Sequence, residues 1–209
     1  MTEGELGQAE RERDLDRVLT FIDAIVAIAI TLLVLPLVEL APELRDGGTV
    51  RDLLRDHADE LWAFALSFYV IARIWISQHH TVAPLLVGNA RITSLLITWT
   101  FTIVVLPFPT SLVASAGDQA LTKVLYVGMM ALSILVIAGL RAEIVRHPEL
   151  TDGSPYAGPL GGLMTAALLV VALVVMLAIP ATSYFPILVL LVEGPLKRAV
   201  ESLRNRPTP

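Results

Sequence analysis

Long apolar runs alternate with short polar segments along most of this chain. The first run, residues 17–37, reads RVLTFIDAIVAIAITLLVLPL and is apolar for longer than one face of a soluble helix requires. About 20 helical residues cross the roughly 30 Å of bilayer hydrocarbon, so this run is long enough to span a membrane. The pattern predicts six membrane spans, at about residues 18–40, 61–78, 92–113, 121–144, 160–179 and 185–196.

Prolines and polar segments predict where these helices bend and how they are joined. Pro36 predicts a kink near the end of the first span, and the tract LPFPT at 106–110 predicts a bend in the third. Residues 41–60 are expected to form a loop that carries a short surface helix at 50–59. The run 185–196 is short for a span, so its insertion is expected to depend partly on pairing with the fifth span.

Composition supports a membrane protein and argues against several other classes. Of the 209 residues, 55% are hydrophobic and only 17% are charged, which is too apolar for a soluble fold. The net charge of -5 comes mainly from the first sixteen residues and the first loop, so we expect no nucleic-acid partner. Cysteine is absent, which excludes disulfides. The acidic start, MTEGELGQAERERDLD, lacks the basic segment of a cleaved signal peptide.

Lys and Arg are distributed unevenly between the two sides that six spans define. The side with both termini holds Arg11, Arg13, Arg17, Arg91, Arg141, Arg146, Lys197, Arg198, Arg204 and Arg206, and the other side holds Arg45, Arg51, Arg55 and Lys123. Because these residues are retained on the cytoplasmic side, ten against four predicts that both termini are cytoplasmic. This arrangement also brings Asp23, at the start of the first span, to the level of Trp75, at the end of the second.

Polar residues near the cytoplasmic face of the membrane predict a cluster that supports the first helix. A carboxylate in hydrocarbon costs about 2.5 to 3.5 kcal/mol and usually persists only with a partner, so Asp23 requires an explanation. The expected cluster contains Arg17, Asp23, Trp75, His79, His80 and Asn89. The alternative is that the two histidines are ordinary interfacial residues. Adjacent histidines point about 100° apart on a helix, and no HExxH run or cysteine is present, so we predict no metal site.

Six residues of the first span follow three-to-four spacing and share one strip of its helix. They are Asp23, Ala24, Ala27, Ile28, Thr31 and Leu35. Small residues let helices approach closely, whereas a ring of isoleucines around a symmetry axis would close a pore by dewetting. The spacing alone leaves both a close-packed interface and a pore lining open.

The remaining polar residues do not form a catalytic pattern. The sequence contains no nucleophile paired with a base, no phosphate-binding loop and no TVGYG-type filter, so we predict that the protein is not an enzyme. Arg73, inside the second span, is expected to extend toward the cytoplasmic boundary. Glu143, at the end of the fourth span, is interpreted as a boundary residue.

One combination of residues is shared with a known family. Arg17, Phe21 and Asp23 follow an R-x-x-x-F-x-D pattern, and Trp75, His79-His80, Asn89 and LPFPT come after it in order. The combination resembles the transmembrane protein 175 family of endolysosomal potassium channels, in its bacterial branch, whose signature is R-x-x-x-F-S-D. Ile22 replaces the signature serine, which removes a hydroxyl beside Asp23.

The resemblance implies a fold, an activity and a set of functional residues. It implies an all-α homotetramer of six-helix subunits in the bacterial cytoplasmic membrane, passing potassium ions through a pore lined by the first helix and needing no cofactor. The pore constriction and gate then fall on Ile28 and Leu35, and Thr31 provides a selective hydroxyl layer in place of a carbonyl filter. The structural polar network consists of Arg17, Phe21, Asp23, Trp75, His79, His80 and Asn89. Residues 1–17 form a cytoplasmic segment, 18–196 the channel domain and 197–209 a basic cytoplasmic tail.

Two other functions are compatible with the same spans. A secondary transporter or proton-coupled exporter needs an ionisable group that changes its accessibility, and Asp23 and Arg73 are the candidates inside the spans. A structural or sensory membrane protein would carry no ion current at all.

Overall fold

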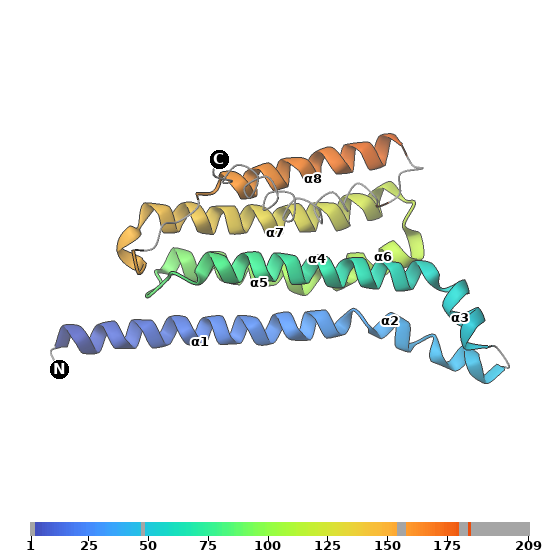
Figure 1. Cartoon of the computed structure of the whole chain (residues 1–209), viewed down its shortest axis with the longest axis horizontal. Coiled ribbons are helices and arrows are strands. Elements are labelled where there is room, and N and C mark those ends of the chain that lie inside the picture. The colour runs from blue at the N-terminus through green and yellow to red at the C-terminus, as the bar shows by residue number, and fades with distance from the viewer. Residues whose placement is uncertain (1–2, 47–48, 154–157, 180–183, 185–209) are drawn as a thin grey trace, which may run out of the picture.

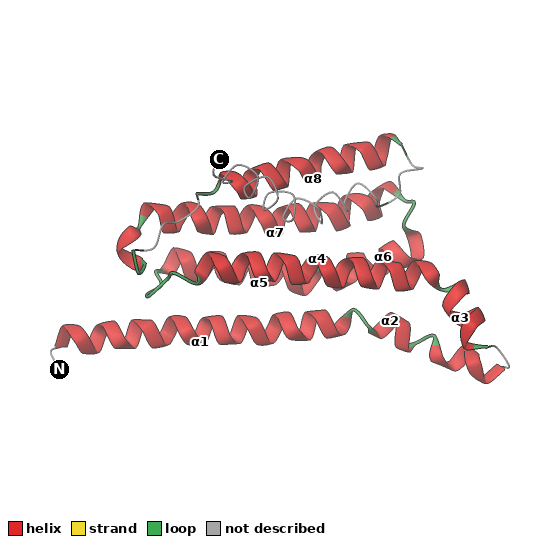
Figure 2. Cartoon of the chain, viewed as in Figure 1, coloured by secondary structure: helices red, strands yellow, loops and turns green. Residues whose placement is uncertain are grey.

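The structure is a bundle of long helices that lie along one axis (Figures 1 and 2). The computed structural model describes residues 3–46, 49–153, 158–179 and 184. The helices in this part of the chain are α1 Glu3–Leu32, α2 Leu35–Val38, η1 Ala41–Asp46, α3 Val50–Asp56, α4 Ala58–Val82, α5 Ala90–Val105, α6 Pro107–Ala116, α7 Ala120–Arg146, η2 Pro148–Leu150 and α8 Leu160–Ala178. In Figure 1, α1 and α8 form opposite outer layers, with α4, α5, α6 and α7 between them.

Five helical stretches in the described part of the chain are long and apolar enough to cross a bilayer. They are Glu12–Leu44, Ala58–Val82, Ala90–Ala116, Ala120–Arg146 and Leu160–Ala178. These stretches coincide with the first five predicted spans, so the prediction of an all-α membrane protein is confirmed. The predicted sixth span, 185–196, lies outside the described residues.

The first helix is longer than its apolar run. It begins at Glu3, although the hydropathy pattern places the first span at about residue 18. The preceding segment is rich in Glu, Arg, Leu and Ala, which favour helix, and contains no proline to stop it. A polar extension therefore continues the membrane helix beyond the apolar run.

Both predicted proline irregularities are confirmed. Because Pro36 has no amide hydrogen and its ring crowds the preceding turn, α1 ends at Leu32 and α2 starts at Leu35. In between, the amide of Leu33 bonds to the carbonyl of Ile30, three residues back, at 3.3 Å. Pro107 and Pro109 similarly divide the third span into α5 and α6. There the amide of Leu106 bonds to Ile103 at 3.2 Å, and that of Thr110 returns to Leu106 at 3.1 Å, so the helix resumes at once.

The connection between the first two spans contains the expected surface helix. Thr49 begins α3, because its hydroxyl oxygen accepts a hydrogen bond from the amide of Asp52 at 3.2 Å. The helix ends at Asp56, three residues before the predicted boundary, and α4 starts at Ala58. His57 is the single residue between them.

Two other connections meet at the opposite end of the bundle, beside the N-terminus of α1 (Figure 1). The amide of Leu86 bonds to the carbonyl of Leu150 at 2.9 Å, and the amide of Asp152 bonds to Pro84 at 3.0 Å. These bonds link the segment after α4 to the segment after α7. The predicted grouping of these two connections with the N-terminus is therefore confirmed.

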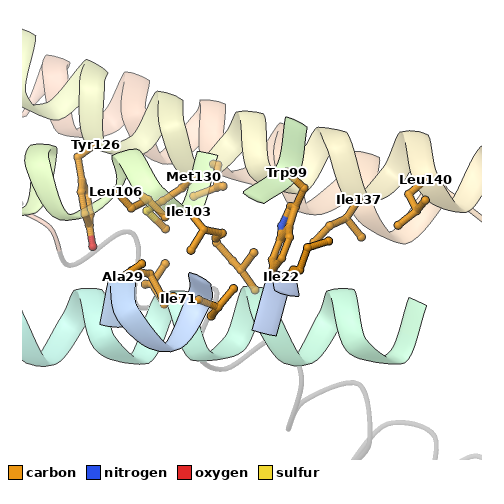
Figure 3. Close-up of a cluster of buried hydrophobic side chains, with 14 of the residues drawn as sticks. Ile22, Ala29, Ile71, Trp99, Ile103, Leu106, Tyr126, Met130, Ile137 and Leu140 are labelled. Atoms are coloured by element: carbon orange, nitrogen blue, oxygen red, sulfur yellow. The ribbon is translucent and has the colours of Figure 1, made fainter. Parts of the chain in front are cut away.

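The main core lies between α1, α4, α5 and α7 (Figure 3). Its fully buried side chains include Ile22 of α1, Ile71 of α4, Trp99 and Ile103 of α5, and Met130 and Leu140 of α7. On its other side, α7 packs closely against α8. A β-carbon built on Gly162 would lie only 3.1 Å from the β-carbon of Ala138, so this close approach depends on glycine.

Candidate functional site

The first helix has a packed face and an exposed face. The packed face carries Ile22, Val26, Ala29 and Leu33, each at most 3% exposed and spaced by three or four residues. All six residues of the predicted strip, Asp23, Ala24, Ala27, Ile28, Thr31 and Leu35, are exposed instead. Ile28 is 59% exposed and Leu35 51%. This strip therefore lies on the outer surface of the described chain.

Thr31 has a defined hydroxyl orientation within the strip. Its Oγ1 donates a hydrogen bond to the carbonyl oxygen of Ile28 at 2.7 Å. A hydroxyl has one proton and two acceptor lone pairs, so a proton directed to the backbone leaves the oxygen able only to accept. Thr31 can therefore offer lone pairs to a cation without rearranging its hydroxyl.

Asp23 connects α1 to α4. Its Oδ1 accepts a hydrogen bond from Nε1 of Trp75 at 2.8 Å. The ring of His79 lies 5.7 Å from the ring of Trp75, with His80 adjacent to it. The structure thus brings Asp23, Trp75 and His79 together at one level of the bundle.

Arg17, Phe21 and Asn89, the other members of the predicted polar network, make no hydrogen bond or ion pair with this group among the described residues, and His80 adjoins it through His79. Arg17 and Phe21 are exposed on α1. Among the residues that the structure places, no group of three or more His, Cys, Asp or Glu is arranged to hold a metal ion.

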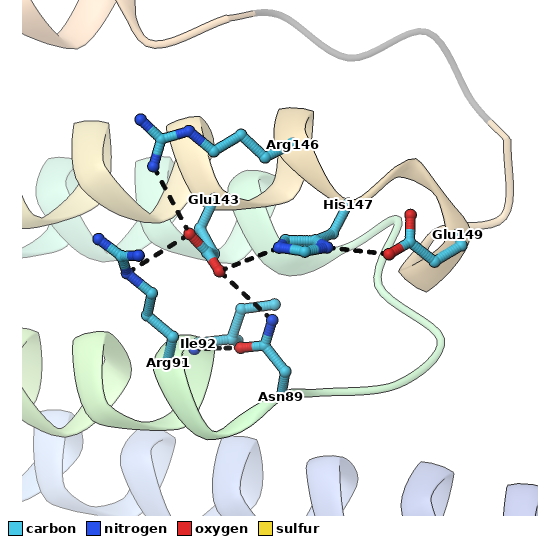
Figure 4. Close-up of polar contacts among 7 residues, drawn as sticks. All are labelled: Asn89, Arg91, Ile92, Glu143, Arg146, His147 and Glu149. Carbon is cyan, nitrogen blue, oxygen red and sulfur yellow. Dashed lines mark hydrogen bonds and ion pairs between the residues drawn. The ribbon is translucent and has the colours of Figure 1, made fainter.

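Asn89 belongs to a second polar cluster, at the start of α5 (Figure 4). Its side-chain oxygen accepts a hydrogen bond from the amide of Ile92 at 2.7 Å and so begins the helix. Its amide nitrogen donates to Oε1 of Glu143, on α7, at 3.4 Å. The hydrogen bonds of Asn89 therefore join α5 to α7, and none reaches Asp23 on α1.

Glu143 is the centre of this second cluster. Its side chain is only 5% exposed and is approached by His147 Nε2 at 3.4 Å, Arg91 Nε at 3.5 Å and Arg146 Nη1 at 3.8 Å (Figure 4). The sequence interpretation of Glu143 as a boundary residue missed this role. The available signal was the spacing of Glu143, Arg146 and His147, because residues three and four apart share a helix face.

Two histidines outside the membrane spans each bridge two carboxylates. His57 lies 2.9 Å from Glu43 and 3.4 Å from Glu60, and these hydrogen bonds raise the pKa of His57 above 6.5, Glu43 having the larger effect. Beyond α7, the backbone amide of Glu149 and then His147, 2.9 Å away, lower the pKa of the Glu149 carboxyl. The contacts of His57 with Glu43 and Glu60 join η1 to α4, next to the end of the first span.

Polar side chains inside the bundle mainly join neighbouring helices. Arg141 of α7 donates to Thr81 at 3.0 Å and to Ser77 at 3.1 Å, both on α4. Lys123, buried at the start of α7, donates to the carbonyl of Met176 at 3.4 Å, near the C-terminal end of α8. Arg73 is half-buried and forms no ion pair with the described residues, so its extension toward the boundary stays a prediction.

This arrangement defines a class of protein. Several bilayer-length apolar helices, joined by short connections and packed around one core, are those of a multi-pass α-helical membrane protein.

A family comparison then gives a more specific resemblance. Residues 17–107 match the model of a family described as the endosomal/lysosomal potassium channel TMEM175. The resemblance predicted from the Arg17 motif is thereby confirmed over these residues, which extend from α1 to the first residue of α6. The matched family is one of ion channels and not of enzymes. No curated protein matches the chain.

Proposed function

We propose that this chain is one subunit of a homotetrameric, potassium-permeable channel in which α1 of each subunit lines a central pore. The family match over residues 17–107 supports potassium as the permeant ion. The observation that carries the pore assignment is the exposed strip of α1, which faces away from the packed residues Ile22, Val26, Ala29 and Leu33. A symmetric assembly gives this apolar strip a common axis to face.

Three positions of the strip have chemistry suited to ion passage. Around a common axis, Ile28 and Leu35 form two apolar rings, and a narrow apolar ring excludes water until it widens. Thr31 lies between them, with its hydroxyl proton on the backbone and its lone pairs outward. A layer of such oxygens replaces part of the hydration shell of a potassium ion. Because this coordination is weak, selectivity over sodium is modest.

Asp23 acts in this proposal as a positioning residue for the pore helix. Its hydrogen bond to Trp75 fixes the rotation of α1 against α4, and thereby the face that α1 presents. A proton-coupled transporter would instead need Asp23 to exchange its proton between two accessible sides. The 2.8 Å bond from Trp75 supports the fixed role.

The assembly lies, on this proposal, in the bacterial cytoplasmic membrane with both termini in the cytoplasm. The excess of Lys and Arg on the side of the termini supports this orientation. The meeting of the N-terminal end of α1 with the connections after α4 and α7 at one end of the bundle supports it as well.

Single-cysteine scanning tests the pore assignment directly, because the native sequence contains no cysteine. Water-soluble thiol reagents are expected to block current through Thr31→Cys and Leu35→Cys, whose positions face the pore. The matched variants Val26→Cys and Leu33→Cys lie on the packed face and should be unaffected. The assignment would be contradicted if the reagents block current through Val26→Cys and Leu33→Cys but not through Thr31→Cys and Leu35→Cys.

A substitution pair tests the role of Thr31. Thr31→Val removes the oxygen at nearly constant volume and should lower potassium-over-sodium permeability, whereas Thr31→Ser should retain most of it. Thr98→Val is the matched control, because Thr98 is also exposed and donates in the same way to the carbonyl of Ser94, on α5. Unchanged permeability in Thr31→Val would show that Thr31 has no part in selectivity.

A further inference from the structure

Two arginines converge at the end of the bundle where α5 begins and α7 ends. Arg91 is the second residue of α5 and Arg146 the last residue of α7, and their side chains are 68% and 63% exposed. Figure 4 shows both guanidinium groups on the same side of Glu143, with His147 on the other side. The two cations therefore share one exposed site.

Glu143 holds these arginines without using up their hydrogen-bonding capacity. Both face its Oε2, at 3.5 Å and 3.8 Å, which is longer than a direct N–H···O hydrogen bond. Its other oxygen, Oε1, faces Asn89 and His147. The second carboxylate of the cluster, Glu149, lies against His147 on the far side of Glu143, and among the described residues the two guanidinium groups form ion pairs with Glu143 alone.

Phosphate is the anion that this geometry fits best. A guanidinium group is a planar fork that can donate two parallel hydrogen bonds to one phosphate. Two forks placed side by side by a buried carboxylate form a preorganised site for such a group, and the helix N-terminus at Asn89 adds a favourable dipole.

The position of the site indicates where the phosphate comes from. Both arginines lie at ends of candidate membrane spans, where lipid headgroups meet the bilayer surface. From Arg146 toward the membrane interior, helical spacing places Ala142, Gly139 and Leu135 on the same face of α7, each at least partly exposed. An acyl chain attached to the phosphate would have an apolar surface to follow.

We propose that Arg91 and Arg146 bind the phosphate of an anionic phospholipid, with Glu143 as the residue that positions them. The bound headgroup links α5 to α7 across their shared end and stabilises their packing. This site is independent of whether the protein conducts ions.

The test uses the purified full-length protein in detergent with added phosphatidylglycerol or phosphatidylcholine. Thermal unfolding and native mass spectrometry measure stabilisation and retained lipid. We expect phosphatidylglycerol to stabilise the wild type more than phosphatidylcholine. Arg91→Gln/Arg146→Gln should bind it more than about tenfold more weakly, because tenfold is less than the effect of losing a single charge-assisted hydrogen bond and this variant loses both guanidinium groups.

Two further variants separate this site from general electrostatics. Arg51→Gln/Arg55→Gln removes the same charge from α3, at the opposite end of the bundle, and should retain wild-type binding. Arg91→Lys/Arg146→Lys keeps the charge but removes the planar forks, so it should fold normally and bind more weakly than wild type. The proposal is overturned if Arg51→Gln/Arg55→Gln loses as much phosphatidylglycerol binding as Arg91→Gln/Arg146→Gln does. It is also overturned if the Gln and Lys variants at Arg91 and Arg146 both bind phosphatidylglycerol as the wild type does.

A lipid-free sample identifies the source of the phosphate. Millimolar inorganic phosphate should give little stabilisation, because it lacks the acyl chain that follows α7. If inorganic phosphate stabilises the wild type as strongly as phosphatidylglycerol does, the site takes the free anion and the lipid assignment is wrong.

Discussion

At the scale of single residues, Ile22 is where the chain departs from the signature of the matched family. The sequence suggests that losing the serine hydroxyl weakens the polar group around Asp23. In the structure, however, Ile22 is only 2% exposed and packs into the core, while Asp23 next to it bonds to Trp75. Adjacent helical residues point about 100° apart, so Ile22 can face the core while Asp23 faces Trp75.

Introducing the signature serine at position 22 should therefore destabilise this protein. Ile22→Ser opens a cavity in the core and leaves a buried hydroxyl, with an expected cost of about 2–5 kcal/mol. The measurement is the free energy of unfolding in detergent. Val174→Ser, on the exposed face of α8, is the control and should change stability little. Equal effects of the two substitutions would show that Ile22 is not packed as described.

Substitutions of Asp23 distinguish support of the pore helix from proton transfer. Asp23→Asn keeps the oxygen that accepts from Trp75, so assembly and current should persist. Asp23→Leu removes that oxygen and should cost roughly 1.5–3 kcal/mol, the range for a hydrogen bond to a charged group. Size-exclusion chromatography and bilayer current are the measurements. Loss of all flux in an intact Asp23→Asn assembly would favour the transporter.

At the scale of helices, the sequence predicts most of the fold. Hydropathy gives the five described spans, and Pro36, Pro107 and Pro109 give the breaks, because both signals are local. The helical start at Glu3 is missed, since a polar extension has no hydropathy signal.

The polar clusters are only partly predictable from the sequence. The pairing of Asp23 with Trp75 follows from their equal depth in antiparallel spans. The bond from Asn89 to Glu143, and the burial of Lys123 against α8, depend on how each helix is rotated against its neighbour. Rotation is fixed by packing across the whole bundle, so local sequence patterns do not specify it.

The junction between η1 and α4 should respond to pH through His57. Because Glu43 and Glu60 raise the pKa of His57 above 6.5, protonated His57 stabilises the folded form. This contribution is complete below about pH 6.5, the ordinary pKa, and is lost as the pH rises through the raised value. Thermal unfolding of wild type and His57→Gln should therefore differ at low pH and converge at high pH. A difference that grows with pH would contradict the assigned bridges.

Neighbouring glycines test the crossing of α7 and α8. A side chain at Gly162 would meet Ala138, whereas a β-carbon on Gly161 would meet no atom within 4 Å. Gly162→Leu should therefore separate the helices and lower the unfolding temperature, and Gly161→Leu should be tolerated. Similar melting temperatures for both variants would show that α7 and α8 do not approach as described.

At the scale of the whole molecule, the exposed strip of α1 links the fold to the proposed function. One face of α1 packs against the rest of the bundle and the other presents Ile28, Thr31 and Leu35 outward. In Figure 1, α1 forms an outer layer of the bundle, where the proposed assembly would place the α1 helices of several copies around a common axis. The central claim is that these faces enclose a potassium pathway.

The most direct test of this claim is the bi-ionic reversal potential, potassium against sodium, of the purified protein in planar bilayers. Ile28→Asn is recorded alongside, with Val174→Asn as the control, because both native side chains are 59% exposed and Val174 lies on α8, in the opposite outer layer. The account predicts a reversal shifted toward the potassium potential and a larger current in Ile28→Asn alone. Silent bilayers from a verified tetramer, or equal currents in both variants, would contradict it.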